Sequence, residues 1–172
     1  MPPRRPSAIP QLPGRGAYNR PMLKAIRDFF DSRIAGDRAG EDQEGALQLA
    51  TAALLLETVR ADHSIDGGER AVVQQAVREN FALDAAAATE LMALAEQEVA
   101  QATDFYQFTS LVNRHFSVEQ KNRVVELMWR VAYADDHVHA HERHLIRKIA
   151  DLLHVTHLDY LAAQARARDA AA

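Results

Sequence analysis

The residues of this chain that could bind a metal ion or move a proton lie mainly in two short segments, ADHSIDGGER and ADDHVHAHER. The first segment carries Asp62 and Glu69, and the second carries Asp135 and Glu142 at the same spacing. Hard cations such as Ca²⁺ and Mg²⁺ bind to several carboxylate and carbonyl oxygens at once. The four carboxylates are therefore candidate ligands for a divalent metal ion.

Histidines add a second kind of ligand to the second segment. Six of the eight histidines of the chain lie between residues 137 and 157, and His137, His139 and His141 alternate along the segment itself. Imidazole nitrogens are good ligands for zinc, nickel and copper. We therefore include His137 and His139 among the candidate metal ligands. A solvated loop that is rich in histidine explains the same residues without any metal.

The carboxylates also have a structural interpretation that requires no ligand. Asp62 and Asp135 follow predicted helices, where a carboxylate can accept backbone N–H groups of the next turn. Glu69 and Glu142 fall in the first turn of the next predicted helix, where the helix dipole favours a negative charge. An EF-hand is excluded, because Val73 stands at the position where that loop needs a glutamate. Structural and metal-binding interpretations both remain open.

The two segments belong to an internal repeat with a constant offset of 73 residues between 54–73 and 127–146. Five positions are identical in the two copies: Leu54 and Leu127, Ala61 and Ala134, Asp62 and Asp135, Glu69 and Glu142, Arg70 and Arg143. Each copy has a buried helix before the acidic segment and an amphipathic helix after it. A chain of this kind most simply forms a helical bundle with approximate internal two-fold symmetry.

Apolar residues recur with the helical period along the chain after residue 20, and no segment has the alternation of a strand. The pattern predicts helices over residues 46–60, 69–81, 85–102, 105–116, 118–134, 144–154 and 157–168. Asp84 is placed to cap the third of these helices, and Ser117 with Gln120 forms a capping-box pattern before the fifth. Trp129 falls on the apolar face of that fifth helix.

The sequence predicts an all-α, compact bundle of about seven or eight helices with two pseudo-symmetric helix–acidic loop–helix repeats. Residues 1–20 are rich in Pro and Arg and are predicted to be a disordered tail. Residues 21–35 are predicted to form an amphipathic helix, residues 36–45 a linker, and residues 46–168 the helical domain.

Composition limits the classes of function. The chain has 172 residues and no cysteine, which excludes disulfides, thiolate nucleophiles and zinc sites built on cysteine. The net charge of the chain is −4, and residues 1–20 carry +4, so residues 21–172 carry −8. Because a negatively charged domain is repelled by the phosphate backbone, we expect no nucleic-acid partner. No apolar run is long enough to span a bilayer. We expect a cytoplasmic protein, with attachment of residues 22–35 to a membrane surface as an alternative.

The repeat, its spacing and the intervening helices resemble the TerB-like tellurite-resistance family over roughly residues 22–165. The stretches that carry the resemblance are MLKAIRDFF, ADHSIDGGER and FTSLVNRHFSVEQKNRVVELMWRVAYADDHVHAHERHLIRKIADLL. The resemblance implies a compact all-α bundle with pseudo-symmetric halves, a link to tellurite or general chemical stress, and a metal-associated role for the acidic residues. Loops of the family place glycine directly after the aspartate, whereas this chain has His63 and Asp136 there.

These observations together predict a binding protein rather than an enzyme. We expect a non-enzymatic stress-response domain that acts as a scaffold for other stress-response proteins and holds a divalent metal through its acidic loops. The alternatives are a metal-dependent enzyme that uses the acidic and histidine-rich loop, and an adaptor at the membrane surface.

Overall fold

The structure is a computed structural model that describes residues 38–60, 67–134 and 137–172. These residues are helical, with no strand among them, so the predicted all-α class is confirmed. The described helices are α2 (Arg38–Val59), α3 (Gly67–Phe81), α4 (Ala85–Gln101), α5 (Tyr106–His115), α6 (Val118–Tyr133), α7 (Ala140–Leu152) and α8 (His157–Ala171). The predicted tail over 1–20 and the predicted helix over 21–35 lie outside the described residues. None of the described helices is long and apolar enough to cross a membrane.

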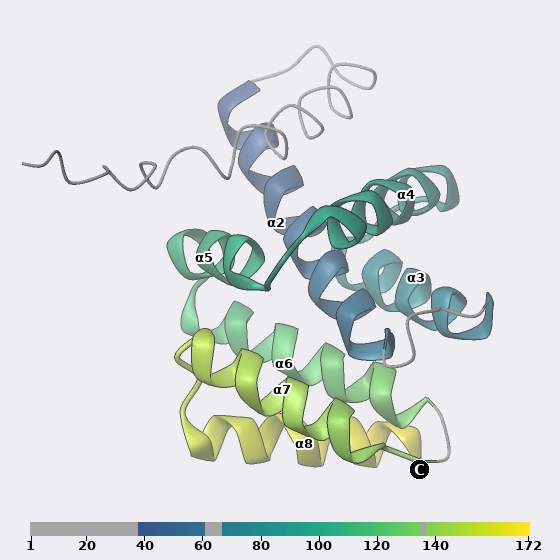
Figure 1. Cartoon of the computed structure of the whole chain (residues 1–172). Helices are drawn as coiled ribbons and strands as arrows, with labels where there is room; N and C mark the ends of the chain where they lie inside the picture. The colour runs from purple at the N-terminus through teal and green to yellow at the C-terminus, as the bar shows by residue number, and fades with distance from the viewer. Residues whose placement is uncertain (1–37, 61–66, 135–136) are drawn as a thin grey trace, which may run out of the picture.

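Helix α2 lies at the centre of the fold and packs against α3, α4, α5, α6 and α7. In Figure 1 it runs down the middle, with α3 and α4 on one side, α5 on the other, and α6, α7 and α8 beneath it. Every residue from Leu47 to Leu56 is buried, so the helix has no solvent-facing side over this stretch. The hydroxyl of Thr51 donates to the carbonyl of Leu47 at 2.8 Å, which satisfies a polar group that the core would otherwise leave unpaired.

The start of α2 differs from the prediction. The sequence predicts a linker over 36–45 and a helix from Ala46, whereas α2 begins at Arg38. Gly40, Gly45 and the charged residues around them are typical of a linker, yet they lie within α2. Extending an existing helix forms one hydrogen bond for each residue that it fixes, whereas starting a helix has a large nucleation cost. A helix anchored by the buried stretch after residue 46 can therefore include residues that would not start a helix on their own.

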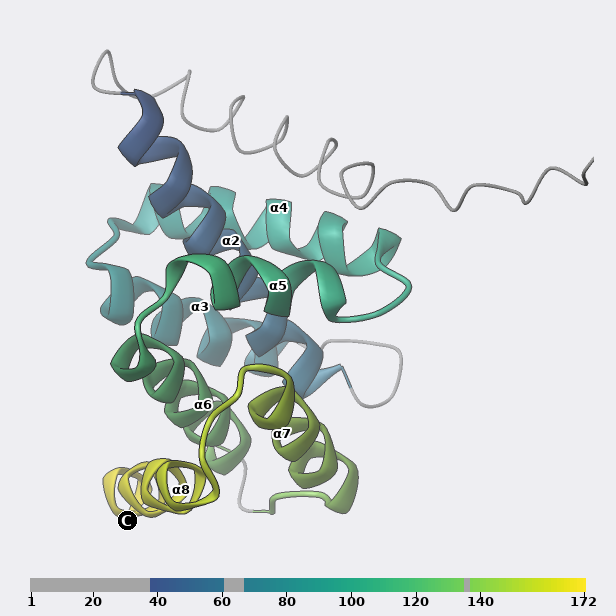
Figure 2. The ribbon, with the colours of Figure 1, turned by 90° about the vertical axis from the view of Figure 1, so that its left-hand side faces the viewer.

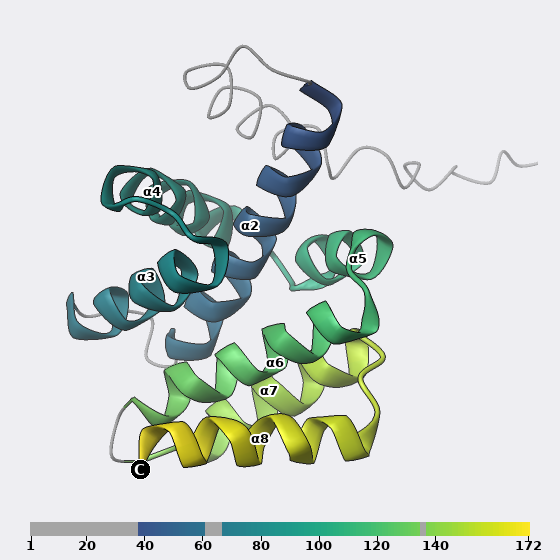
Figure 3. The same ribbon diagram turned by 180° about the vertical axis from the view of Figure 1, so that it is seen from behind.

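The second half of the fold is built on α6, which packs most extensively on α8 and also contacts α2, α3 and α7. Figures 2 and 3 show α6, α7 and α8 together on one side of α2. Trp129 is fully buried on α6, as predicted, with its ring 5.6 Å from the ring of Tyr133 and 5.7 Å from that of Tyr160. The contact with Tyr160 joins α6 to α8, whereas the contact with Tyr133 lies within α6.

Local hydrogen bonds set most of the helix boundaries where the sequence predicts them. The carboxylate of Asp84 accepts the N–H of Ala87 at 2.7 Å and caps α4. Ser117 and Gln120 form the predicted capping box before α6, with bonds of 3.2 and 2.8 Å. Helix α7 begins at Ala140, which places Glu142 in its first turn as predicted, four residues before the start at residue 144 that the apolar pattern alone predicts.

A buried carboxylate holds α6 and α8 together. Glu126 on α6 is 5% exposed and accepts hydrogen bonds at 2.8 Å from the guanidinium groups of Arg123, Arg130 and Arg166. Burial alone would raise the pKa of Glu126, but the hydrogen bond from Arg166 and the three positive charges outweigh burial and lower the pKa below its ordinary value. Arg166 lies on α8, so this ion pair links two helices that are 40 residues apart in the sequence.

Replacement of Glu126 by glutamine should destabilise the protein at pH 7 by about 1–3 kcal/mol, because the amide group would face three guanidinium donors without a countercharge. The pKa of Glu126 is lower in the folded state, so its contribution is complete above the unfolded value near 4.5 and is lost as the pH falls through the folded value. Urea denaturation should therefore show that the wild type and Glu126→Gln differ at pH 7 and converge as the pH falls well below 4.5. Glu119→Gln, an exposed change on the same helix, is the control. Equal stability of Glu126→Gln and the wild type at pH 7 would contradict this account.

Candidate functional site

Residues of both repeats line one pocket of about 260 Å³. It is lined by the last residues of the two buried helices and the first turns of the two helices that follow: Val59 of α2, Gly68, Glu69 and Val72 of α3, Val131 of α6, Ala134 directly after α6, and Glu142 of α7. Glu69 and Glu142 are the equivalent glutamates of the repeat, 73 residues apart in the sequence. The fold therefore brings two of the predicted metal ligands to the same pocket.

The packing of α2 and α6 explains why the two glutamates meet. Both helices end at the pocket, because Val59 is the last residue of α2 and Ala134 directly follows α6. The helix after each of them starts at the same place, with Glu69 in the first turn of α3 and Glu142 in the first turn of α7. Of the equivalent residues in the two copies, Glu69 and Glu142 both line this pocket.

Glu142 also has the structural role that the sequence predicts for it. Its side chain is buried, and its carboxylate accepts the backbone N–H of His139 at 2.8 Å. This is the glutamate half of a capping box, in which the third helical residue reaches back to the residue before the helix. A carboxylate has about four lone-pair sites on its two oxygens, so a capping bond does not by itself prevent a carboxylate from binding a metal ion.

The described lining of the pocket contains acidic side chains and no basic one. Two carboxylates line it, and two helices end there, each presenting the negative end of its dipole. The positive dipole ends of α3 and α7 offset part of this charge, and the remaining lining residues of the described chain are small or apolar.

The other predicted ligands do not line the described part of this pocket. His137 and His139 are exposed, and the ring of His139 stacks with the ring of His141 at 5.7 Å between centroids. Within the described ranges, no three Asp, Glu or His side chains are grouped closely enough to hold a metal ion. Asp62 and Asp135 lie outside the described residues, in the segments 61–66 and 135–136 that adjoin the pocket in the sequence.

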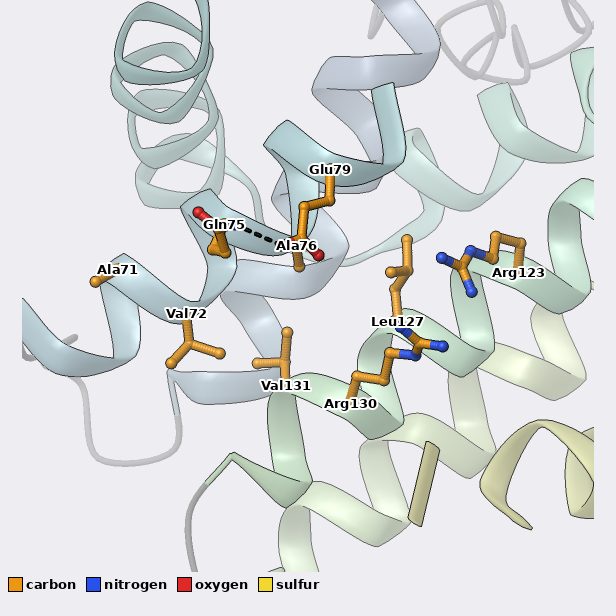
Figure 4. A pocket seen from close by; sticks show the side chains of 9 residues that line it. All are labelled: Ala71, Val72, Gln75, Ala76, Glu79, Arg123, Leu127, Arg130 and Val131. Atoms are coloured by element: carbon orange, nitrogen blue, oxygen red, sulfur yellow. Dashed lines mark hydrogen bonds between the residues drawn. The ribbon is translucent and has the colours of Figure 1, made fainter. Parts of the chain in front are cut away.

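A second hollow, which the sequence analysis missed, lies between α3 and α6 with a volume of about 380 Å³. Figure 4 shows apolar side chains of both helices in it, with the side chains of Arg123 and Arg130 on the α6 side. The signal in the sequence was the spacing of Arg123, Glu126 and Arg130, which places all three on one face of a helix. We refer to this hollow as the arginine groove, and to the pocket of Glu69 and Glu142 as the acidic pocket.

The chain is similar to a known protein family. The model of the family described as tellurite resistance protein TerB matches residues 48–165. Neither the curated proteins nor the solved structures include a significant match.

The capping role of Glu142 can be separated from its charge. Glu142→Gln keeps an oxygen that can accept the N–H of His139, and should leave stability within about 0.5 kcal/mol of the wild type. Glu142→Ala removes the cap and should lower the free energy of unfolding by about 1 kcal/mol. Thermal or urea denaturation measures both, with His144→Ala as an exposed control on the same helix. Equal stability of the glutamine and alanine variants would show that the cap contributes nothing.

Proposed function

Because the chain belongs to the tellurite resistance protein TerB family, we propose that it is a non-enzymatic binding scaffold of the chemical-stress response whose acidic pocket holds a divalent cation. One observation carries the proposal: Glu69 and Glu142, equivalent in the repeat and distant in the sequence, line the same pocket. A purely structural role for each glutamate would require only that it lie at the start of its own helix. It would not require the two helix starts to face one pocket.

The acidic pocket supplies some, but not all, of the oxygen ligands that a hard cation needs. Calcium takes six to eight oxygen ligands and magnesium six, many of them carboxylates and waters. Glu69 and Glu142 provide two carboxylates, so the proposal requires further oxygen ligands beyond the described lining. Asp62 and Asp135 are the candidates there, as the repeat predicts. A bound cation would join α3 of the first repeat to α7 of the second, because Glu69 lies in the first turn of α3 and Glu142 in the first turn of α7.

The lining of the acidic pocket supports binding rather than catalysis. Among the described residues it consists of two carboxylates, a glycine, an alanine and three valines. A hydrolytic site needs a nucleophile within reach of a base, and these side chains offer no such pair. We therefore propose a cation with a structural or sensing role, and stress-response proteins as the partners of the scaffold.

Isothermal titration calorimetry of the metal-free full chain with Ca²⁺, Mg²⁺, Zn²⁺ and Ni²⁺ tests the cation. We expect heat and a rise in melting temperature with at least one of these ions, because a ligand that binds only the folded state stabilises it. Glu69→Gln with Glu142→Gln, and separately Asp62→Asn with Asp135→Asn, should weaken binding at least tenfold while leaving the helical circular dichroism unchanged.

The matched control is Glu90→Gln with Glu119→Gln, which removes the same charge at exposed positions outside the pocket. Binding that weakens equally in this control would reflect the net charge of the chain and would refute the acidic pocket as the site. Absence of heat and of any thermal shift for all four ions would refute the cation itself.

A further inference from the structure

The arginine groove is lined mainly by apolar side chains, and its positive charge lies on the α6 side. Its floor consists of Val72 and Ala76 on α3 and of Leu127 and Val131 on α6. Along the α6 side run Arg123 and Arg130, whose positions appear in Figure 4. A concave apolar surface of this size with a few polar groups at its edge is typical of a binding site.

The guanidinium groups beside the groove have donors left over after their internal bonds. Arg123 uses Nη1 for Glu126 and Nε for Asn80, and Arg130 uses Nη2 for Glu126. Each guanidinium has five N–H donors, and these two side chains are 40% and 38% exposed. The Nε–H of Arg130 is buried and has no partner among the described residues.

The cluster also has an excess of positive charge. Three arginines surround the single carboxylate of Glu126, which leaves +2 on a folded body whose overall charge is negative. Opposite the arginines, on α3, the only acidic lining residue is Glu79, which accepts a hydrogen bond from Gln75. An occupant would thus meet positive charge on its α6 side and a weakly negative, polar edge on its α3 side.

We propose that the arginine groove docks an amphipathic helix of a partner protein, with an apolar stripe against Val72, Leu127 and Val131 and carboxylates along the flank that faces Arg123 and Arg130. Helices bind in grooves of this kind through apolar side chains spaced three and four residues apart. The stretch of α3 that lines the groove runs from Ala71 to Glu79, about 12 Å or two helical turns. That length fits a short helix with two or three apolar anchors.

Charge complementarity selects this occupant over other apolar ones. Arginine pairs with carboxylates through two parallel hydrogen bonds, and such charge-assisted bonds are stronger than neutral ones. A helix with lysines on the same flank would face Arg123 and Arg130 directly and would be repelled. The groove therefore discriminates by charge among helices of equal hydrophobicity.

This inference rests on the scaffold part of the proposed function and not on the cation, because the groove is lined by neither Glu69 nor Glu142. Binding in the groove should persist in EDTA. Failure of the cation proposal and failure of the groove proposal are thus separate results.

The test uses fluorescence anisotropy with a labelled synthetic helical peptide that carries leucines at i, i+3, i+4 and i+7 and glutamates on one flank. A second peptide with lysines in place of the glutamates is the charge control. We expect the full chain to bind the acidic peptide at least tenfold more tightly than the basic one in EDTA. Arg130→Gln should weaken acidic-peptide binding about tenfold, and Ala76→Leu, which fills the groove, should weaken it further.

Arg166→Gln is the matched variant, because Arg166 also bonds Glu126 at 2.8 Å but does not line the groove. It should retain acidic-peptide binding within about twofold, so a loss in Arg130→Gln alone cannot be ascribed to a weakened Glu126 cluster. The circular dichroism of each variant confirms folding.

Three outcomes would overturn the proposal. One is that the acidic and basic peptides bind equally, or that neither binds. Another is that Arg130→Gln and Arg166→Gln lose acidic-peptide affinity to the same extent. The third is that sedimentation shows the wild-type chain to associate with itself and that Ala76→Leu abolishes this association, because a second copy would then occupy the groove.

Discussion

From Leu47 to Leu56 the side chains of α2 are buried on every face of the helix, so the rest of the chain must enclose it. Each leucine exposed to solvent would reduce the free energy of unfolding by about 1.5–3 kcal/mol. Exposure of several would exceed the whole stability of a typical domain, so other helices must cover α2. The helices from α3 to α7 supply that enclosure. Because α6 is one of them, the buried helices of the two repeats lie against each other. The C-terminal ends of α2 and α6 line the same pocket.

The acidic pocket is a consequence of this packing. Once α2 and α6 end at the same place, the first turns of α3 and α7 begin there too, and the repeat places a glutamate in each. Glu142 shows that structural and binding interpretations are compatible, because one carboxylate caps α7 through the N–H of His139 and also lines the pocket. The glutamates of the two acidic segments therefore lie at the same pocket, although they are 73 residues apart in the sequence.

The sequence predicted the parts of the fold that depend on local patterns. The caps at Asp84 and Ser117 and the burial of Trp129 are confirmed, because each follows from residues within one or two turns. The predicted start of α2 at residue 46 was wrong, because burial of the later part of the helix outweighs the low helix propensity of the glycines near its beginning. The arginine groove could not be predicted, because it depends on how α3 lies against α6. Nor could the spacing of Arg123, Glu126 and Arg130 reveal that Arg166 of α8 would complete the cluster.

The acidic pocket and the arginine groove share two wall residues, Val72 of α3 and Val131 of α6. A cation in the acidic pocket and a helix in the arginine groove would therefore both lie beside Val72 and Val131. An occupant of one site that changed how closely α3 and α6 pack would also change the shape of the other site, because Val72 and Val131 line both. Linkage then requires the effect to be equal in both directions: a cation that favours the docked helix is itself bound more tightly when the helix is docked. A scaffold with two such sites would have, in one pair of helices, both a means of sensing an ion and a means of selecting a partner.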